Sequence, residues 1–372
     1  MTGLLPPPTS GAPVDSEQPL DRHPLAQPAE PGHATSLPGY PDEHADDARP
    51  QKLIRVAEVS DRVFRGISRG GGLIVLLIMV LVGIFLSVNA VQAVSAVGVV
   101  EFVTETQWSP ETNTFGIAAL LTGTVLIAVV ALVVALPLAL GMALFLTEVT
   151  TGGFQRMLRS VIDLMAAVPS VVFGLWGLAF LQVQIVPFAR WLSTWFGWIP
   201  IFAVDGADPD NPLPNDSLYT SSTFIAGLVV ALMIVPIMTS MMVESFSRAP
   251  IGEREAAFAL GATRWGMIKS VVLPFGKGGI IGGTMLGLGR ALGETIAIYL
   301  IIAPIFQINI HILQRGANSI AAHIALRYGE ANPFAMSALM AAGLALFILT
   351  MLVNFTASIV ISRSRSGAES EG

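Results

Sequence analysis

Long apolar segments constrain this chain more than any other feature. Six of them qualify as membrane-spanning helices, at roughly residues 71–94, 117–146, 161–185, 223–243, 278–302 and 336–361. A helix needs about 20 apolar residues to cross a bilayer, where every backbone polar group must be satisfied within the protein. Six such segments predict an all-α membrane protein, a bundle of six transmembrane helices and not a β-barrel. Pro137, Pro169 and Pro236 interrupt the second, third and fourth segments, which neighbouring helices can accommodate.

The composition supports a membrane protein and excludes several kinds of chemistry. Of the 372 residues, 53% are hydrophobic and 12% are charged, whereas a typical soluble domain has about 25% charged residues. The absence of cysteine excludes disulfides, thiolate metal sites and cysteine nucleophiles. We expect no nucleic-acid partner, because Lys and Arg form no basic stripe away from the membrane-flanking segments. We also expect no metal site, because none of the five histidines is paired with a carboxylate at metal-ligand spacing.

The first 50 residues differ from the rest of the chain. They contain 11 of the 24 prolines, with polar residues between them, and bury too little apolar area to offset the entropy of ordering. We predict a disordered, Pro-rich cytoplasmic tail at 1–50. Residues 51–114 then form a basic juxtamembrane segment, the first transmembrane helix and an outer loop. The transport domain covers 115–362, with a cytoplasmic loop at 244–277, and a short cytoplasmic tail covers 363–372.

The distribution of Lys and Arg predicts the orientation. Sixteen of these residues lie on the side that carries both termini and the loops at 147–160 and 244–277, whereas three lie on the opposite side. Cytoplasmic segments of membrane proteins carry the excess of Lys and Arg. Both termini and the 244–277 loop are therefore expected to face the cytoplasm.

Three tryptophans follow the third apolar segment. Trp191, Trp195 and Trp198 are spaced by four and then three residues, which places their rings on one face of a helix. We expect a short interfacial helix over residues 188–198 that anchors the protein at headgroup depth on the outer side. Contact with an external partner is the alternative.

A polar loop interrupts the apolar pattern on the cytoplasmic side. Two adjacent alanines on a short helix allow close packing, and a glycine can supply the left-handed turn that ends it. A long charged loop in an otherwise apolar chain indicates a surface that meets another protein. The characteristic residues of the loop are Glu255, Ala256, Ala257, Gly261, Leu273 and Pro274.

This spacing resembles the signature of importer-type ABC-transporter permeases: Glu-Ala-Ala, three residues, Gly, nine residues, an aliphatic residue, one residue and Leu-Pro. Val271 stands where the family more often has isoleucine. The resemblance implies a type I importer bundle whose Glu-Ala-Ala helix docks into a cleft on a cytoplasmic ATPase dimer. The sequence has no Gly-x-x-x-x-Gly-Lys-Ser/Thr motif to cradle ATP phosphates. We therefore expect a transport subunit that is no enzyme and binds no cofactor, with ATP and Mg²⁺ used by the partner ATPase.

Two charged residues lie inside the fifth apolar segment. Arg290 is about 12 residues past its start, roughly 18 Å along a helix and near the bilayer midplane. Glu294 follows one turn later, so the two side chains can pair. A buried ion pair returns little net stability, which makes stability a poor reason for it. We predict that Arg290 lines the substrate pathway and binds an oxyanion, with Glu294 holding the arginine between substrates. A structural salt bridge is the alternative.

These residues narrow the resemblance. The stretch from Met285 to Thr295 looks like the fifth-span signature of phosphate-specific ABC permeases, particularly their C-type subunit. Residues 143–148 and 316–320 are similar to the same family, although Ala317 departs from its usual Pro-Gly-Asn-Ser-Ile. The resemblance covers about residues 70–362 and implies that Arg290 and Glu294 form the anion path.

The sequence thus predicts a permease subunit of a binding-protein-dependent ABC importer that translocates inorganic phosphate across a bacterial cytoplasmic membrane. The implied partners are a related A-type permease subunit, a cytoplasmic ATPase dimer, an extracytoplasmic phosphate-binding protein and membrane lipid. One alternative is a permease for another oxyanion, sulfate or molybdate. The other is a secondary anion transporter that uses Arg290 and Glu294 in a proton-coupled cycle.

Overall fold

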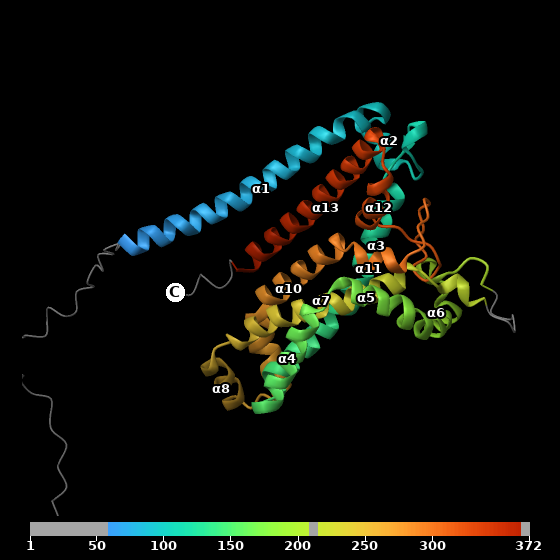
Figure 1. The fold of residues 1–372 in the computed structure, drawn as a ribbon. Coiled ribbons are helices and arrows are strands. Elements are labelled where there is room, and N and C mark those ends of the chain that lie inside the picture. The colour runs from blue at the N-terminus through green and yellow to red at the C-terminus, as the bar shows by residue number, and fades with distance from the viewer. Residues whose placement is uncertain (1–58, 208–214, 366–372) are drawn as a thin grey trace, which may run out of the picture. The chain divides into compact units, whose positions relative to one another are not determined.

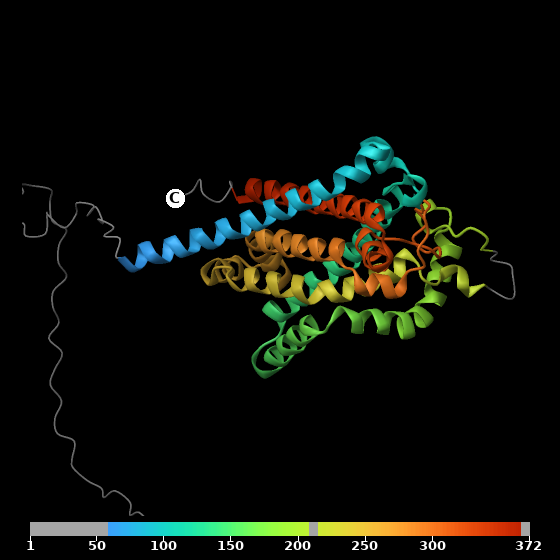
Figure 2. The same ribbon diagram turned by 45° about the horizontal axis from the view of Figure 1, so that its top comes forward.

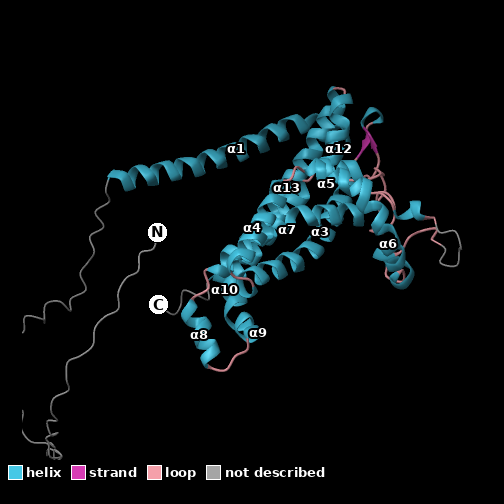
Figure 3. Ribbon diagram, turned by 60° about the horizontal axis from the view of Figure 1, so that its bottom comes forward, coloured by secondary structure: helices cyan, strands magenta, loops and turns pink. Residues whose placement is uncertain are grey.

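The computed structural model describes residues 59–207 and 215–365 of the chain. Most of these residues are helical, and one small hairpin provides the strands that the described part contains (Figure 3). The predicted disordered tail at 1–50 lies outside the described residues, as does most of the predicted tail at 363–372.

Within residues 59–207 and 215–365, six helical segments are long and apolar enough to cross a membrane, which confirms the predicted number of spans. They are Val63–Val97, Ala118–Val149, Ser170–Phe196, Thr223–Ser247, Arg264–Gly293 and Pro333–Thr356. Several spans consist of more than one helix. The helices are α1 (Val59–Val97), α2 (Val99–Thr104), α3 (Ala118–Leu144), α4 (Gly152–Ala167), α5 (Ser170–Trp176), α6 (Gln182–Phe196), α7 (Thr223–Ser247), α8 (Ile251–Ala259), α9 (Arg264–Met267), α10 (Leu273–Gly293), α11 (Ile296–Ile301), α12 (Ile320–Arg327) and α13 (Pro333–Arg365).

Short elements join these helices or interrupt them. Strands β1 (Trp108–Ser109) and β2 (Thr114–Phe115) pair antiparallel, and the sequence did not predict this hairpin. Three π-helical turns lie within spans: η2 (Phe145–Val149), η3 (Gly177–Leu181) and η6 (Ile268–Val272). The 3₁₀ helices are η1 (Pro110–Thr112), η4 (Pro200–Phe202), η5 (Asp216–Tyr219) and η7 (Tyr328–Glu330).

The chain divides into two units, Met1–Phe64 and Arg65–Gly372. Of the first unit, the structure describes the opening turns of α1. In the second unit, α7 packs between α3 and α10, and α13 packs on α10 (Figures 1 and 2). Small residues make the α3–α7 contact close, because a short side chain lets two helix backbones approach. Four fully buried alanines recur along α3 at every fourth position: Ala131, Ala135, Ala139 and Ala143.

The two ends of this bundle carry different elements. One end, called here the α8 end, gathers the end of α3, helix α4 and helix α8. The other, called here the α12 end, gathers the start of α3, the hairpin and helix α12. The spans run between these two ends, so residues far apart in sequence meet at each of them.

The third span begins later than predicted. Helix α4 is a separate amphipathic helix, and the chain is extended at Val168 and Pro169 before the span starts at Ser170. A proline disfavours helical geometry in the residue before it, so Pro169 ends α4 and does not interrupt a span. Trp191 and Trp195 consequently lie in the last turns of the third span, in α6, and not in a separate interfacial helix.

The fifth span also differs from the predicted 278–302. Its helix starts at Arg264, passes through the π-helical turn η6, and stops at Gly293. Glu294 has extended geometry, with φ −66° and ψ 127°, and a separate helix, α11, follows. The predicted continuous helix is therefore two helices joined at a break.

Candidate functional site

A groove of about 860 Å³ lies between α7, α10 and α13. Its floor and walls are mostly apolar, with Met241 on α7 and Leu286 on α10 among them. Four polar side chains line it as well: Arg290, Glu294, Asn354 and Ser358. Both predicted pathway residues therefore face the same groove, together with two polar residues of α13 that the sequence analysis did not single out.

Arg290 presents its charge in this groove. It lies in the last turn of α10, where a cation interacts favourably with the helix dipole, and its side chain is exposed. No ion pair joins it to another residue within 59–207 and 215–365. A guanidinium that keeps its charge and its hydrogen-bond donors in a largely apolar groove is suited to binding an oxyanion.

Contrary to the prediction, Glu294 does not pair with Arg290. Because α10 ends at Gly293, the residue leaves the helical path and no longer sits one turn above the arginine. Glu294 is 8% exposed, and its Oε1 accepts a hydrogen bond of 3.3 Å from the backbone N–H of Ala297 in α11. The carboxylate thus holds the break between the two helices while it lines the groove.

Helix α8 carries the predicted Glu255, Ala256 and Ala257. None of its nine residues is buried, and Ala257 rests against the central core of the bundle. Beyond its end, Leu260 is 89% exposed, and Trp265 also projects outward. An exposed helix with charged and apolar side chains at one end of a membrane bundle is suited to binding a partner protein.

Gly261 ends this helix as the sequence predicted. Its φ is +82°, in the left-handed region that glycine adopts without strain. The N–H of Gly261 donates to the carbonyl of Phe258 at 2.9 Å, and the N–H of Ala262 donates to that of Ala257 at 3.0 Å. This pair of bonds is the Schellman motif, which satisfies the last carbonyls of a helix.

Leu273 and Pro274 lie at the start of α10, directly after the π-helical turn η6. The N–H of Leu273 donates to the carbonyl of Ile268 and closes the wider turn. Proline lacks an N–H, so a change of hydrogen-bond pattern at this point accommodates Pro274 in a continuous helix. Leu273 packs against the central core from within the fifth span.

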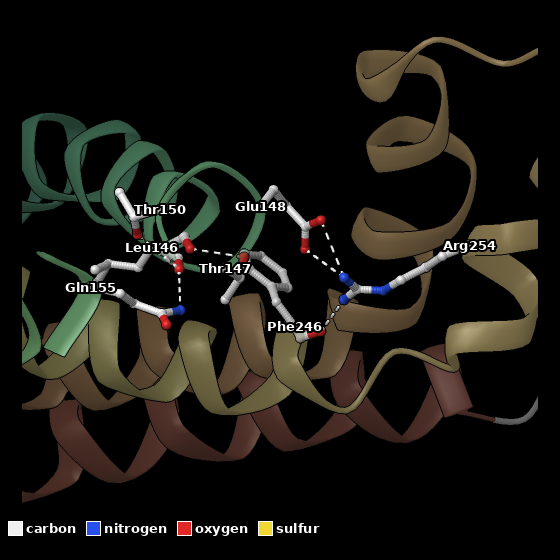
Figure 4. Close-up of polar contacts among 8 residues, drawn as sticks. Leu146, Thr147, Glu148, Thr150, Gln155, Phe246 and Arg254 are labelled. Carbon is white, nitrogen blue, oxygen red and sulfur yellow. Dashed lines mark hydrogen bonds and ion pairs between the residues drawn. The ribbon is translucent and has the colours of Figure 1, made fainter. Parts of the chain in front are cut away.

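An ion pair at the α8 end was not predicted. Arg254 Nη1 in α8 lies 3.1 Å from Glu148 Oε1 and 3.2 Å from Glu148 Oε2, in η2 (Figure 4). The two residues are separated by 106 positions in sequence. The available signals were weak: Glu148 closes the family-like stretch 143–148, and Arg254 belongs to the charged loop.

The stretch 316–320 fastens the α12 end of the bundle. Gly316 has φ +100°, and Ser319 caps α12 by accepting from the N–H of Ala322. The N–H of Ile320 donates to Thr124 Oγ1 at 3.0 Å, which ties α12 to α3. Gly123 lies so close to the carbonyl of Asn318 that an added Cβ would overlap its oxygen.

His323 lies on α12, which is not one of the six spans. It is 1% exposed, and its ring meets Trp108 edge-on at 4.5 Å between centroids. Neither ring nitrogen has a hydrogen-bond partner among the described residues. Burial, with a smaller effect from the charge of Arg327, lowers the pKa of His323 to about 4, so the ring is neutral at pH 7.

Comparison with known proteins defines the class. The family model for the binding-protein-dependent transport system inner membrane component matches residues 135–366. This chain belongs to that family. It is also similar to the phosphate transport system permease protein PstC 2 of Mycobacterium tuberculosis, at 37% identity over 319 residues, 84% of this chain and 95% of the relative.

Other curated relatives have the same description. The phosphate transport system permease protein PstC of Mycobacterium leprae is 39% identical over 260 residues, 69% of this chain and 77% of the relative. That of Mesorhizobium japonicum is 33% identical over 322 residues, 85% and 94% of the two chains. Among solved structures, a bacterial ABC transporter that imports the acidic polysaccharide alginate has a TM-score of 0.51 at 17% identity. The structural match covers 81% of this chain and 99% of the transporter chain, which supports a shared fold.

Proposed function

We propose that this chain is the permease subunit of an importer for inorganic phosphate, driven by a separate ATPase. One observation carries the proposal: relatives described as phosphate transport permeases match most of the chain, and the family match at residues 135–366 includes the groove that holds Arg290. An arginine inside a membrane protein is costly, and such residues mark substrate or ion pathways. Here Arg290 binds the phosphate oxygens, while Glu294 holds the helix break beside it.

The partners follow from the same proposal. A cytoplasmic ATPase dimer, which uses ATP and Mg²⁺, docks on α8 through Glu255, Ala256 and Ala257. A related A-type permease subunit completes the translocation path, and an extracytoplasmic binding protein delivers phosphate at the α12 end. The α8 end and both termini then face the cytoplasm, in agreement with the excess of Lys and Arg on that side.

Uptake measurements test the role of Arg290. Cells that lack this chain receive the wild type, Arg290→Lys or Arg290→Gln, and uptake of radiolabelled phosphate and sulfate is measured. The wild type should restore phosphate uptake and not sulfate uptake. Arg290→Gln should lower it about tenfold or more, since a charge-assisted hydrogen bond contributes about 1.5–3 kcal/mol. Arg290→Lys should retain an intermediate rate, because it keeps the charge but loses the planar donor pair.

Arg190→Gln provides the matched control. Arg190 pairs with Asp216 at a partly exposed site, so cells with this variant should take up phosphate normally. Restored sulfate uptake with no phosphate uptake would reassign the substrate. Uptake that survives ATP depletion but collapses with the proton gradient would favour a secondary transporter. Normal phosphate uptake by Arg290→Gln would contradict the assigned pathway.

Cysteine labelling tests the orientation. The chain has no cysteine, so Leu260→Cys at the α8 end and Glu330→Cys at the α12 end are unique reporters. A membrane-impermeant maleimide added to intact cells should label Glu330→Cys and leave Leu260→Cys unlabelled until the membrane is opened. The reverse pattern would place α8 out of reach of a cytoplasmic ATPase.

A further inference from the structure

Two half-buried residues, Arg254 and Ala257, mark the side of α8 that faces the bundle. Ala257 rests against the central core, and Arg254, three residues earlier, has a side chain that is 20% exposed. Residues three apart in a helix lie on the same face, so these two define the attached side of α8. Ala257 offers a single methyl group, and Arg254 therefore provides the longer connection.

Glu148 receives Arg254 at a fixed position. Its side chain is 4% exposed and lies in the π-helical turn η2, at the end of the second span (Figure 4). Gln155 Nε2 donates to the carbonyl of Leu146 in the same turn at 2.6 Å, and the hydroxyl of Thr150 donates to that carbonyl at 3.2 Å. These bonds hold the turn, so Glu148 and the end of the second span move together.

The second nitrogen of the same guanidinium reaches another span. Arg254 Nη2 donates to the carbonyl of Phe246, near the end of α7, at 2.7 Å (Figure 4). The ring of Phe246 is fully buried and lies directly over Gly276 of α10, where a Cβ would overlap it. One side chain of α8 thus contacts the second and fourth spans, and reaches the fifth through one aromatic ring.

A contribution to stability does not by itself account for this arrangement. A buried ion pair must offset the cost of removing two charges from water, and apolar residues of the same volume often do as well. What the arrangement adds is geometry, because a planar guanidinium holds two acceptors on different helices at a fixed separation. Two apolar surfaces can shift against each other, whereas hydrogen bonds of fixed geometry from Arg254 carry a displacement of α8 to the helices that hold Glu148 and Phe246.

We propose that the Arg254–Glu148 ion pair is the link through which movement of α8 reaches the membrane spans. Both are positioning residues for transport, and the inference rests on the proposed function, in which a partner ATPase moves α8. Without the pair, ATP hydrolysis and substrate movement become separate events.

The test uses the whole complex in lipid vesicles, with the ATPase, the second permease subunit and the binding protein present. The variants are Glu148→Gln, Arg254→Gln and the double variant Glu148→Gln/Arg254→Gln. Phosphate transported per ATP hydrolysed is measured beside the subunit composition of the complex. Each single variant should lower the transported amount per ATP about tenfold, on the scale of one lost charge-assisted hydrogen bond. The double variant should lose no more than either single one, because both remove the same link.

The double variant also separates linkage from folding, since it leaves no unpaired buried charge. If it assembles and transports as much phosphate per ATP as the wild type, the inference is overturned. If it fails to assemble as well, the pair holds the fold together, and the inference is equally overturned. The matched control is Glu244→Gln, which removes the acidic partner from the exposed Glu244–Arg248 pair in the same region and should leave the ratio unchanged.

The wild-type vesicles distinguish this inference from the proposed function. A wild-type complex that moves neither phosphate nor sulfate on ATP addition overturns the proposed function and the inference with it. A wild-type complex that transports phosphate, alongside variants with an unchanged ratio, overturns the inference alone.

Discussion

The two ends of the bundle differ in how they use their polar groups. At the α12 end, Asn318, Ser319 and His323 are buried, and the backbone of Ile320 is bonded to α3. At the α8 end, α8 has no buried residue, and its Arg254 pairs with Glu148 of the second span. Burying backbone polar groups requires partners within the chain, so the α12 end is built into the protein's own core. The α8 end instead leaves α8 exposed and joins it to the second and fourth spans through the side chain of Arg254.

The largest expected effect tests how tightly the α12 end is built. Gly123→Ala places a Cβ against the backbone oxygen of Asn318, which cannot move aside as a flexible side chain could. We expect a loss of about 3 kcal/mol or more, at the upper end of overpacking costs. Thermal unfolding in detergent measures it.

Gly141→Ala is the matched control in the same helix, because no atom beyond the adjacent residues and turns of α3 lies within 4 Å of the added Cβ. It should be neutral or stabilising by up to about 1 kcal/mol, since alanine has the higher helix propensity. Equal unfolding temperatures for the two variants would show that the contact of α3 with residues 316–320 can relax.

The pH dependence of the α12 end gives the next largest effect. The pKa of His323 is lowered from 6.5 to about 4 in the folded protein, so the unfolded chain binds more protons between these values. Its contribution to stability is complete above pH 6.5 and is lost as the pH falls toward 4. By pH 4.5 the loss is about 2–3 kcal/mol, at 1.36 kcal/mol per pKa unit.

The measurement is the difference in unfolding temperature between pH 7 and pH 4.5 for the wild type and for His323→Leu. Carboxylates titrate in both proteins and cancel in the comparison. The variant should lack the histidine contribution and so lose less stability on acidification. Identical pH profiles would mean that the buried ring takes up its proton without cost.

At the α8 end, Gly261→Val should have a smaller effect on stability and a clear effect on assembly. A side chain at φ +82° costs about 1–2 kcal/mol, because Cβ approaches the following carbonyl oxygen. The Schellman motif should open, and less ATPase should co-purify with the permease. Gly252→Ala, near the start of α8 with open space around it, should retain normal co-purification. If Gly261→Val retains the ATPase fully, the turn at Gly261 is not required for docking of the ATPase.

The smallest expected effect concerns the exposed ion pair of the α8 end. Glu244 and Arg248 have side chains that are 66% and 71% exposed, and such pairs contribute about 0–1 kcal/mol. Glu244→Gln should therefore shift the unfolding temperature very little. If Glu244→Gln and Glu148→Gln shift the unfolding temperature equally, the exposed Glu244–Arg248 pair and the buried Glu148–Arg254 pair contribute alike to stability.

The features that the sequence predicted are those set by local chemistry. A bilayer imposes length and apolarity on each span, so the six spans follow from the apolar segments alone. Gly261 was predicted because a left-handed residue after a short helix favours glycine. The tail at 1–50 remains a prediction, as do the roles of Arg290, Glu294 and the residues of α8.

The features that the sequence did not predict depend on tertiary contacts. No proline marks the break after Gly293, and after the polar pair Glu294 and Thr295 the apolar residues resume at Ile296. Pro169 is compatible with both a kinked span and the start of one, and the packing of α4 on α7 decides between them. The pairing of Glu148 with Arg254 joins two distant segments, and nothing local to either one specifies it.

The length of α1 has a consequence for the surrounding lipid. Its candidate span, Val63–Val97, has 35 residues, about 52 Å of helix, against a hydrocarbon thickness of about 30 Å. Even at a tilt of about 40°, the steepest commonly seen, it would cover about 40 Å. The first turns, with Arg65 and Arg69, therefore stand clear of the acyl chains. A thinner or thicker membrane can be met by a change in the tilt of α1, which keeps the apolar length of this helix matched to the bilayer.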